Sequence, residues 1–104
     1  YSPMLGSETS SLIMFYYVYV LENLDGDLYV GLTNNLSKRL KEHNRGLNFS
    51  TKLGLPWRIV YVEACLNKDD AKRREKYLKT SQGARLLKRR LKEYLYKKRS
   101  RKIS

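Results

Sequence analysis

Several features are scarce in this chain of 104 residues, and each scarcity excludes a class of protein. The single cysteine, Cys65, has no partner for an intramolecular disulfide, which suits a reducing compartment, and we expect it to be a small buried apolar residue. The longest apolar run, residues 12–21, is about half the length of a membrane span. No basic segment precedes that run, so we expect no secretory signal. These absences predict a cytoplasmic protein without a membrane-spanning segment.

Acidic residues are scarce as well. The chain carries 22 Lys and Arg against 10 Asp and Glu, which gives a formal net charge of +12. Residues 1–32 contain neither Lys nor Arg, whereas residues 83–104 contain ten basic residues and one acid, Glu93. Such an imbalance favours a polyanionic partner, either nucleic acid or an anionic membrane surface.

Composition divides the chain into one domain and two tails. Residues 1–11 are rich in Ser, Thr, Gly and Pro without periodicity, so we expect a flexible tail over 1–13. Met14 is a candidate natural start, which would make that tail non-native. One domain is expected over 14–98, including a basic C-terminal helix, followed by a solvated basic tail over 99–104.

The domain begins with a pattern typical of a β-hairpin, with strands over 15–22 and 28–32. A two-residue turn at Asp25-Gly26 would place Tyr19 and Tyr29 on opposite faces. A three-residue loop, with Gly26 in the left-handed conformation, places them on the same face. We predict the second register because it gathers one wholly aliphatic face, made of Val18, Val20, Leu28, Val30 and Leu32. The other face then holds Tyr17, Tyr19, Tyr29 and Gly31.

The sequence pattern predicts one further strand and three helices in the rest of the domain. A helix is expected between caps at residues 33–35 and Gly46, and the strand over 57–65. Helices over about 68–80 and 84–98 follow, separated by Gly83. The order of the expected elements is therefore β-β-α-β-α-α.

Three polar residues admit both a structural and a functional interpretation. Glu75 lies beside the apolar stripe of its helix, where it either pairs with Lys79 one turn later or, half-buried, binds a divalent ion. Arg39 is either one of many solvated basic residues or a guanidinium able to grip a phosphate through two hydrogen bonds. His43 has no Cys/His cluster around it, so a structural or phosphate-contacting role is favoured over catalysis.

The tyrosine face also has two interpretations. Tyrosine packs well on strands, so a face of this kind needs no further role. Gly31, however, interrupts a strand on the same face, and a strand glycine often marks the close approach of a ligand or of another backbone.

Tyr17-Val18-Tyr19 and Tyr29-Val30-Gly31 resemble the paired signature of the GIY-YIG nuclease superfamily. Arg39 on the following helix and Glu75 on a later helix match that family's arginine and metal-binding glutamate. The first motif has Tyr17 in place of glycine, as small single-domain bacterial members tolerate. The resemblance covers about residues 15–94 and extends to the catalytic domains of an excision-repair nuclease subunit and of homing endonucleases.

The resemblance implies an α+β fold, with a small three-stranded antiparallel sheet flanked by helices. It also implies a metal-dependent DNA endonuclease that hydrolyses phosphodiester bonds, nicking DNA according to its structure and with low sequence specificity. Tyr29 or Tyr19 would take the proton from the attacking water, Arg39 would hold the scissile phosphate, and Glu75 would hold one Mg²⁺ or Mn²⁺ ion. The partner would be branched, nicked or duplex DNA, RNA remains an alternative, and no membrane would be involved. The chain would act as a monomer or a dimer. Substrate-binding roles are expected for Tyr17, Gly31, Lys38, His43, Arg85, Lys88 and Arg89.

Two departures from the family pattern keep other functions open. Some members carry a lysine where this chain has Leu32, and many carry an asparagine after the glutamate, which this chain lacks. The first alternative is therefore a catalytically weak or inactive nucleic-acid-binding module that acts with a partner in DNA repair or recombination. The second is a basic interaction protein in which the tyrosines and Glu75 are packing residues.

Overall fold

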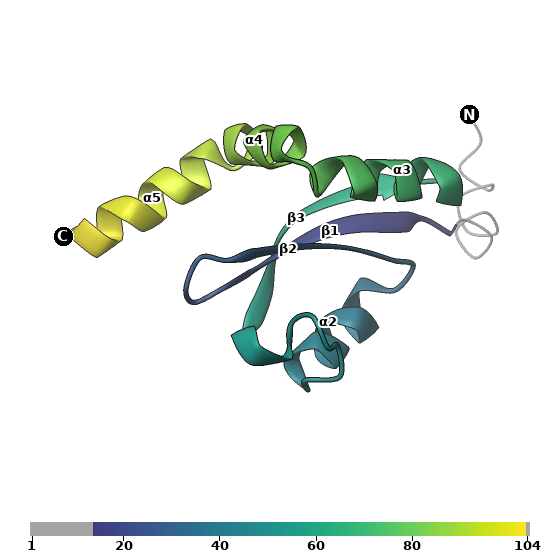
Figure 1. Ribbon diagram of the computed structural model, residues 1–104, viewed down its shortest axis with the longest axis horizontal. Helices are drawn as coiled ribbons and strands as arrows, with labels where there is room; N and C mark the ends of the chain where they lie inside the picture. Colours follow the sequence, from purple (N-terminus) through teal and green to yellow (C-terminus); the bar gives the residue numbers. More distant parts are fainter. Residues whose placement is uncertain (1–13, 104) are drawn as a thin grey trace, which may run out of the picture.

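The computed structural model describes residues 14–103, with side chains described up to residue 98. The expected tail over 1–13 therefore lies outside the described residues. The elements follow the order β1 (Tyr16–Asn23), β2 (Leu28–Thr33), α2 (Leu36–Asn44), η1 (Lys52–Gly54), β3 (Trp57–Cys65), α3 (Lys68–Leu78), α4 (Ser81–Arg90) and α5 (Lys92–Ile103). The strands form one antiparallel sheet in the order β2-β1-β3 (Figure 1). The predicted α+β class is confirmed.

The hairpin adopts the register that places the tyrosines on one face. Tyr19 pairs with Gly31, and Val20 pairs with Val30. Gly26 has a φ of 85°, as the three-residue loop requires. The register predicted from the aliphatic face is therefore confirmed.

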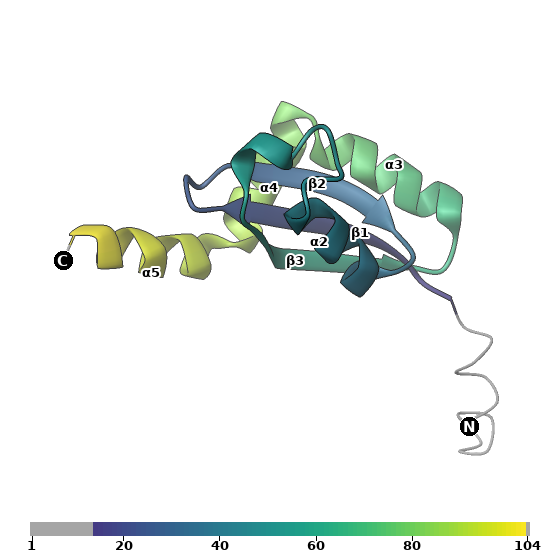
Figure 2. The ribbon, with the colours of Figure 1, turned by 90° about the horizontal axis from the view of Figure 1, so that it is seen from below.

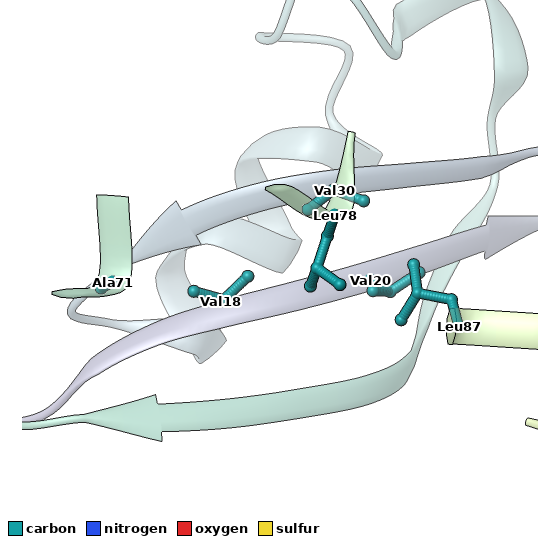
Figure 3. Packing of buried hydrophobic residues seen from close by; sticks show 6 residues of the cluster. All are labelled: Val18, Val20, Val30, Ala71, Leu78 and Leu87. Carbon is teal, nitrogen blue, oxygen red and sulfur yellow. The ribbon is translucent and has the colours of Figure 1, made fainter. Parts of the chain in front are cut away.

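Helices cover both faces of the sheet (Figures 1 and 2). On the aliphatic face, side chains from β1 and β2 pack against α3 and α4 (Figure 3); the buried members are Val18, Val20, Val30, Ala71, Leu78 and Leu87. On the tyrosine face, Leu36 and Leu40 of α2 pack against Tyr19, Leu21 and Trp57. Two residues are less buried than expected, because Leu28 lies at the exposed end of β2 and Cys65 is only partly covered by the core.

Helix α2 is held by its caps and by the start of β3. The Asn35 side chain accepts a hydrogen bond from the Lys38 backbone, and Gly46 ends the segment at a φ of 75°. Asn44 exchanges two hydrogen bonds with the Trp57 backbone, of 2.7 and 2.9 Å. These bonds set the position of α2 over the tyrosine face.

The predicted helix over 84–98 is wrong, because this region forms two helices, and the second continues to Ile103. The first, α4, is capped by Thr80, whose side chain accepts a hydrogen bond from the Gly83 backbone. Gly83 thus lies inside α4 rather than between helices. A Cβ there would be 2.2 Å from the Tyr77 carbonyl oxygen, so glycine is needed where α4 packs against the end of α3.

Helix α5 projects from the body of the domain (Figures 1 and 2) and is tied to the sheet by a buried carboxylate. Glu22 is 2% exposed and accepts hydrogen bonds from Tyr94 Oη and, at 2.9 Å, from Lys98 Nζ. Although burial opposes ionisation, these donors hold the pKa of Glu22 below its usual value. The contact places the first turns of α5 against the hairpin.

Candidate active site on the tyrosine face

A chain of three buried polar side chains lies on the tyrosine face. Tyr19 is 2% exposed, and His43 is fully buried. Tyr19 Oη lies 2.8 Å from His43 Nε2, and His43 Nδ1 lies 2.7 Å from Thr51 Oγ1. His43 reaches this position because α2 directs Arg39 and His43, one turn apart, toward the sheet. The lone histidine is therefore part of a continuous hydrogen-bond chain.

Burial determines the protonation of this chain. It raises the pKa of Tyr19 to about 12, although the nearby Arg39 guanidinium acts in the opposite direction. It also lowers the pKa of His43 below 6.5, and Arg39 lowers it further. At neutral pH Tyr19 therefore keeps its proton and the imidazole is neutral. A neutral imidazole donates a hydrogen bond from one ring nitrogen and accepts one at the other. His43 therefore donates to one of Tyr19 and Thr51 and accepts from the other.

Gly31 has a different role from the expected one. A Cβ at this position would lie 2.3 Å from Tyr19 Oη and 2.4 Å from Cζ of the same ring. The ring of Tyr19 therefore fills the space above its cross-strand partner, where a substrate-binding role was expected for Gly31. The strand glycine allows the hydroxyl of Tyr19 to reach His43.

Arg39 lies beside this chain with part of its guanidinium free. Its Nη1 donates to Glu42 Oε1 at 3.3 Å. Its Nε is buried and, among the described residues, has no hydrogen-bond partner. The Arg39 side chain as a whole is 40% exposed. The outer nitrogens of its guanidinium, rather than the buried Nε, are therefore the donors available to an incoming anion.

Tyr29 lies next to the same histidine but is only half-buried. Its ring centroid is 5.2 Å from that of His43 and 6.4 Å from that of Trp57, and both contacts are edge-to-face. No hydrogen bond to its hydroxyl is found within residues 14–98. Of the two tyrosines, Tyr29 is the more exposed.

Glu75 approaches from another side of the sheet. It lies on α3, which covers the aliphatic face. The negative charge of its carboxylate raises the pKa of Tyr19 slightly, much less than burial does. Its side chain is 24% exposed, and Oε2 lies 3.2 Å from Lys79 Nζ. The pairing one turn along the helix is the structural alternative drawn from the sequence. Within the described part of the chain, no three His, Cys, Asp or Glu residues gather as a metal-binding group.

The comparison with known protein families decides what this arrangement is. Residues 15–88 match the model of the GIY-YIG catalytic domain. This chain belongs to the GIY-YIG family. The matched segment includes the hairpin, α2, β3, α3 and most of α4, and so contains both tyrosine motifs, Arg39 and Glu75.

Curated relatives of this GIY-YIG domain carry the family name UPF0213, which states no activity. A UPF0213 protein of Clostridium perfringens is 47% identical over 64 residues, which cover 61% of this chain and 69% of that protein. One from Staphylococcus saprophyticus is 35% identical over 74 residues, covering 70% and 90% of the two chains. An NMR structure of a UPF0213 protein from Bacillus halodurans is 34% identical, covers 71% of this chain and 82% of its own, and superimposes with a TM-score of 0.46.

The remaining residues expected to bind substrate divide between two sides of the GIY-YIG domain. Tyr17 lies on β1 and exposed Lys38 on α2, beside Arg39. The other expected substrate-binding residues lie on α4, away from Arg39, and are exposed: Arg85, Lys88 and Arg89. Leu87 turns α4 toward the aliphatic face, so its basic residues lie across the sheet from α2. None of the described helices is long and apolar enough to cross a membrane.

Sequence reasoning missed Thr51 and Trp57. Thr51 is 1% exposed, and its backbone carbonyl accepts a hydrogen bond of 2.8 Å from Trp57 Nε1. Both residues hold the loop after α2 against the histidine. No spacing in the sequence indicates this, because Thr51 lies in a polar loop and meets His43 only through tertiary packing. The one available signal in the sequence is the single tryptophan directly after Pro56.

Proposed function

We propose that this GIY-YIG domain is a divalent-metal-dependent endonuclease that hydrolyses phosphodiester bonds in DNA, with low sequence specificity. The observation that carries the proposal is the convergence of Arg39, the Tyr19–His43–Thr51 chain and Tyr29 at one end of the tyrosine face. Phosphodiester hydrolysis needs a cation on the phosphate and a group that takes a proton from water. The arrangement supplies candidates for both.

Arg39 binds and neutralises the scissile phosphate in this proposal. Its side chain is 40% exposed, and the outer nitrogens of its guanidinium plane suit two parallel hydrogen bonds to phosphate oxygens. The existing bond from Nη1 to Glu42 restrains the guanidinium. The neutral His43 lets the arginine act as the main positive charge at this point.

Tyr29 takes the proton from the attacking water. Tyr19 is less suited to that step, because its hydroxyl is buried against His43 and its pKa is raised to about 12. Tyr19 instead positions the site, since its ring lies over Gly31 and its hydroxyl orders the imidazole that contacts the Tyr29 ring. The two motif tyrosines thus have different roles.

Glu75 is the residue that would hold the metal. One half-buried carboxylate fits Mg²⁺ or Mn²⁺, because these ions accept hard oxygen ligands and Mg²⁺ keeps several of its waters. The bound ion would supply charge neutralisation on the phosphate and polarisation of a water. Lys79 competes with it, since its ammonium already lies 3.2 Å from the same carboxylate.

The second candidate is a nucleic-acid-binding module with little or no cleavage, working with a partner in DNA repair or recombination. One observation favours it: the ion pair with Lys79 that already neutralises Glu75. Leu32 in the place of a family lysine agrees with it.

A nicking assay separates the two candidates. Labelled branched, nicked and linear DNA, together with a matched RNA, is incubated with Mg²⁺ or Mn²⁺ and either the parent protein or Glu75→Gln. Cleavage by the parent alone supports the endonuclease, and the best substrate defines its preference. Unchanged cleavage by Glu75→Gln would overturn the metal assignment. DNA binding without cleavage by either protein would support the binding module.

A further inference from the structure

Two shallow pockets adjoin along α2. The first, of about 390 Å³, lies between the end of β2, the start of α3 and Arg39. The second, of about 620 Å³, continues along α2 to Arg45 and Leu47. Both are lined by Asn35, Lys38 and Glu42, so the two pockets lie side by side. We call the two pockets together the α2 groove, and Arg39 of the candidate active site lines the first of them.

The α2 groove is strongly basic. Its charged lining consists of Lys38, Arg39, Lys41, Glu42, Arg45 and Lys68. The single acid, Glu42, is already paired with Arg39. Lys38, Lys41 and Arg45 follow one helix face at spacings of three and four residues, over about 10 Å of helix axis. That length matches roughly three nucleotides of a strand at the spacing found in a duplex.

An exposed aromatic residue follows the far end of the groove. Leu47 lines the groove and is followed two residues later by Phe49, which is 83% exposed. Lys52 Nζ lies 4.8 Å from the Phe49 ring centroid. The cation covers one face of the ring and leaves the other open. A nucleobase stacks on such a ring only when it is unpaired at an end, a branch or a single-stranded segment.

We propose that the α2 groove carries the nucleic-acid strand that enters the active site, and that Phe49 stacks on an unpaired base of that strand. The inference rests on the proposed function and adds a substrate class to it, a nucleic acid with a single-stranded segment. The strand follows α2 rather than the basic surface of α4. The surface of α4 lies on the opposite side of the sheet from Arg39. A short nucleic-acid strand bound along α4 would therefore not reach Arg39.

The test compares two double variants of equal charge. Lys41→Ala/Arg45→Ala removes two exposed charges from the groove, and Arg85→Ala/Arg89→Ala removes two exposed charges from α4. Binding to a labelled single strand, a blunt duplex and a forked duplex is measured by fluorescence anisotropy across salt concentrations, in EDTA to prevent cleavage. The groove variant should weaken single-strand binding about tenfold or more, and the slope of log K against log salt concentration should become shallower by about 1.4. Both changes should be clearly smaller for the α4 variant.

Phe49 is tested separately from the charges. Phe49→Ala should weaken binding to the single strand and the fork by about 5- to 100-fold, with little change for the blunt duplex, and Phe49→Trp should restore it. Leu53→Ala is the matched control, because Leu53 is 95% exposed on the same loop. Thermal unfolding of each variant checks that these surface changes leave the fold intact.

The outcomes distinguish this inference from the proposed function. If the parent protein binds none of the three nucleic acids, the proposed function fails and this inference fails with it. If the parent binds but the α4 variant loses as much affinity as the groove variant, only the groove assignment is overturned. Equal losses on duplex and single strand for Phe49→Ala, or no loss at all, would overturn base stacking.

Discussion

The buried histidine makes the stability of this protein depend on pH in a narrow and testable window. His43 is the single histidine of the chain and is fully buried between Tyr19 and Thr51. Burial and the Arg39 charge lower the pKa of His43 below 6.5 in the folded protein. The unfolded chain therefore binds a proton more readily than the folded one. As the pH falls through 6.5, protonation favours unfolding, and stability decreases until the folded-state pKa is reached.

The size of the effect follows from proton linkage. A difference of one bound proton between the unfolded and folded states changes the free energy of unfolding by at most about 1.4 kcal/mol per pH unit. Glu22 and Glu63, whose pKa values are lowered by their donors, lose their contribution only as the pH falls below about 4.5. The interval from pH 6.5 to 5 therefore reports mainly on His43.

Urea unfolding followed by the fluorescence of Trp57, the single tryptophan, measures this slope. The parent protein should lose stability from pH 6.5 to pH 5. His43→Gln, which keeps a donor and an acceptor but does not titrate, should show a nearly flat profile over the same interval. A flat parent profile, or an equal slope in the variant, would refute the reasoning that His43 is neutral because it is buried.

Three further predictions concern the tyrosines, the metal site and the strand glycine. Tyr29→Phe should reduce the nicking rate by about 10²- to 10⁴-fold without loss of stability, because the variant lacks the group that takes the proton. Tyr19→Phe should instead lower the free energy of unfolding by about 1–3 kcal/mol, because the buried imidazole of His43 loses a hydrogen-bond partner. Rate assays and urea unfolding of both variants check this, and equal rates for Tyr29→Phe and the parent would contradict it. Lys79→Ala should tighten Mn²⁺ binding up to about fivefold in a calorimetric titration, since it frees the Glu75 carboxylate; weaker binding would exclude competition between the two cations. Gly31→Ala should cost about 1–3 kcal/mol in urea unfolding, because its Cβ would lie 2.3 Å from Tyr19 Oη; an unchanged midpoint would show that the ring moves away freely.

Local patterns in the sequence predicted much of the fold. Alternation along the hairpin and a glycine suited to a positive φ determined the register, because slipping by one residue would have mixed the aliphatic and tyrosine faces. The caps of α2 and α3 are local as well, since Asn35 and Asn67 bond to backbone groups within three residues. The residues that match the GIY-YIG family also follow from the sequence alone.

Tertiary packing decided how those residues are used. Gly83 ends no helix, because the deciding contact is the Tyr77 carbonyl on a neighbouring helix rather than anything in its own segment. The space over Gly31 is filled by the Tyr19 ring because the two residues are cross-strand partners. His43 meets Tyr19 across 24 positions of sequence, and only the packing of α2 on the sheet brings the two side chains together. The sequence by itself determined which groups are present and which face of each strand they occupy, whereas their pairing, burial and pKa values depend on contacts that form only when distant segments pack.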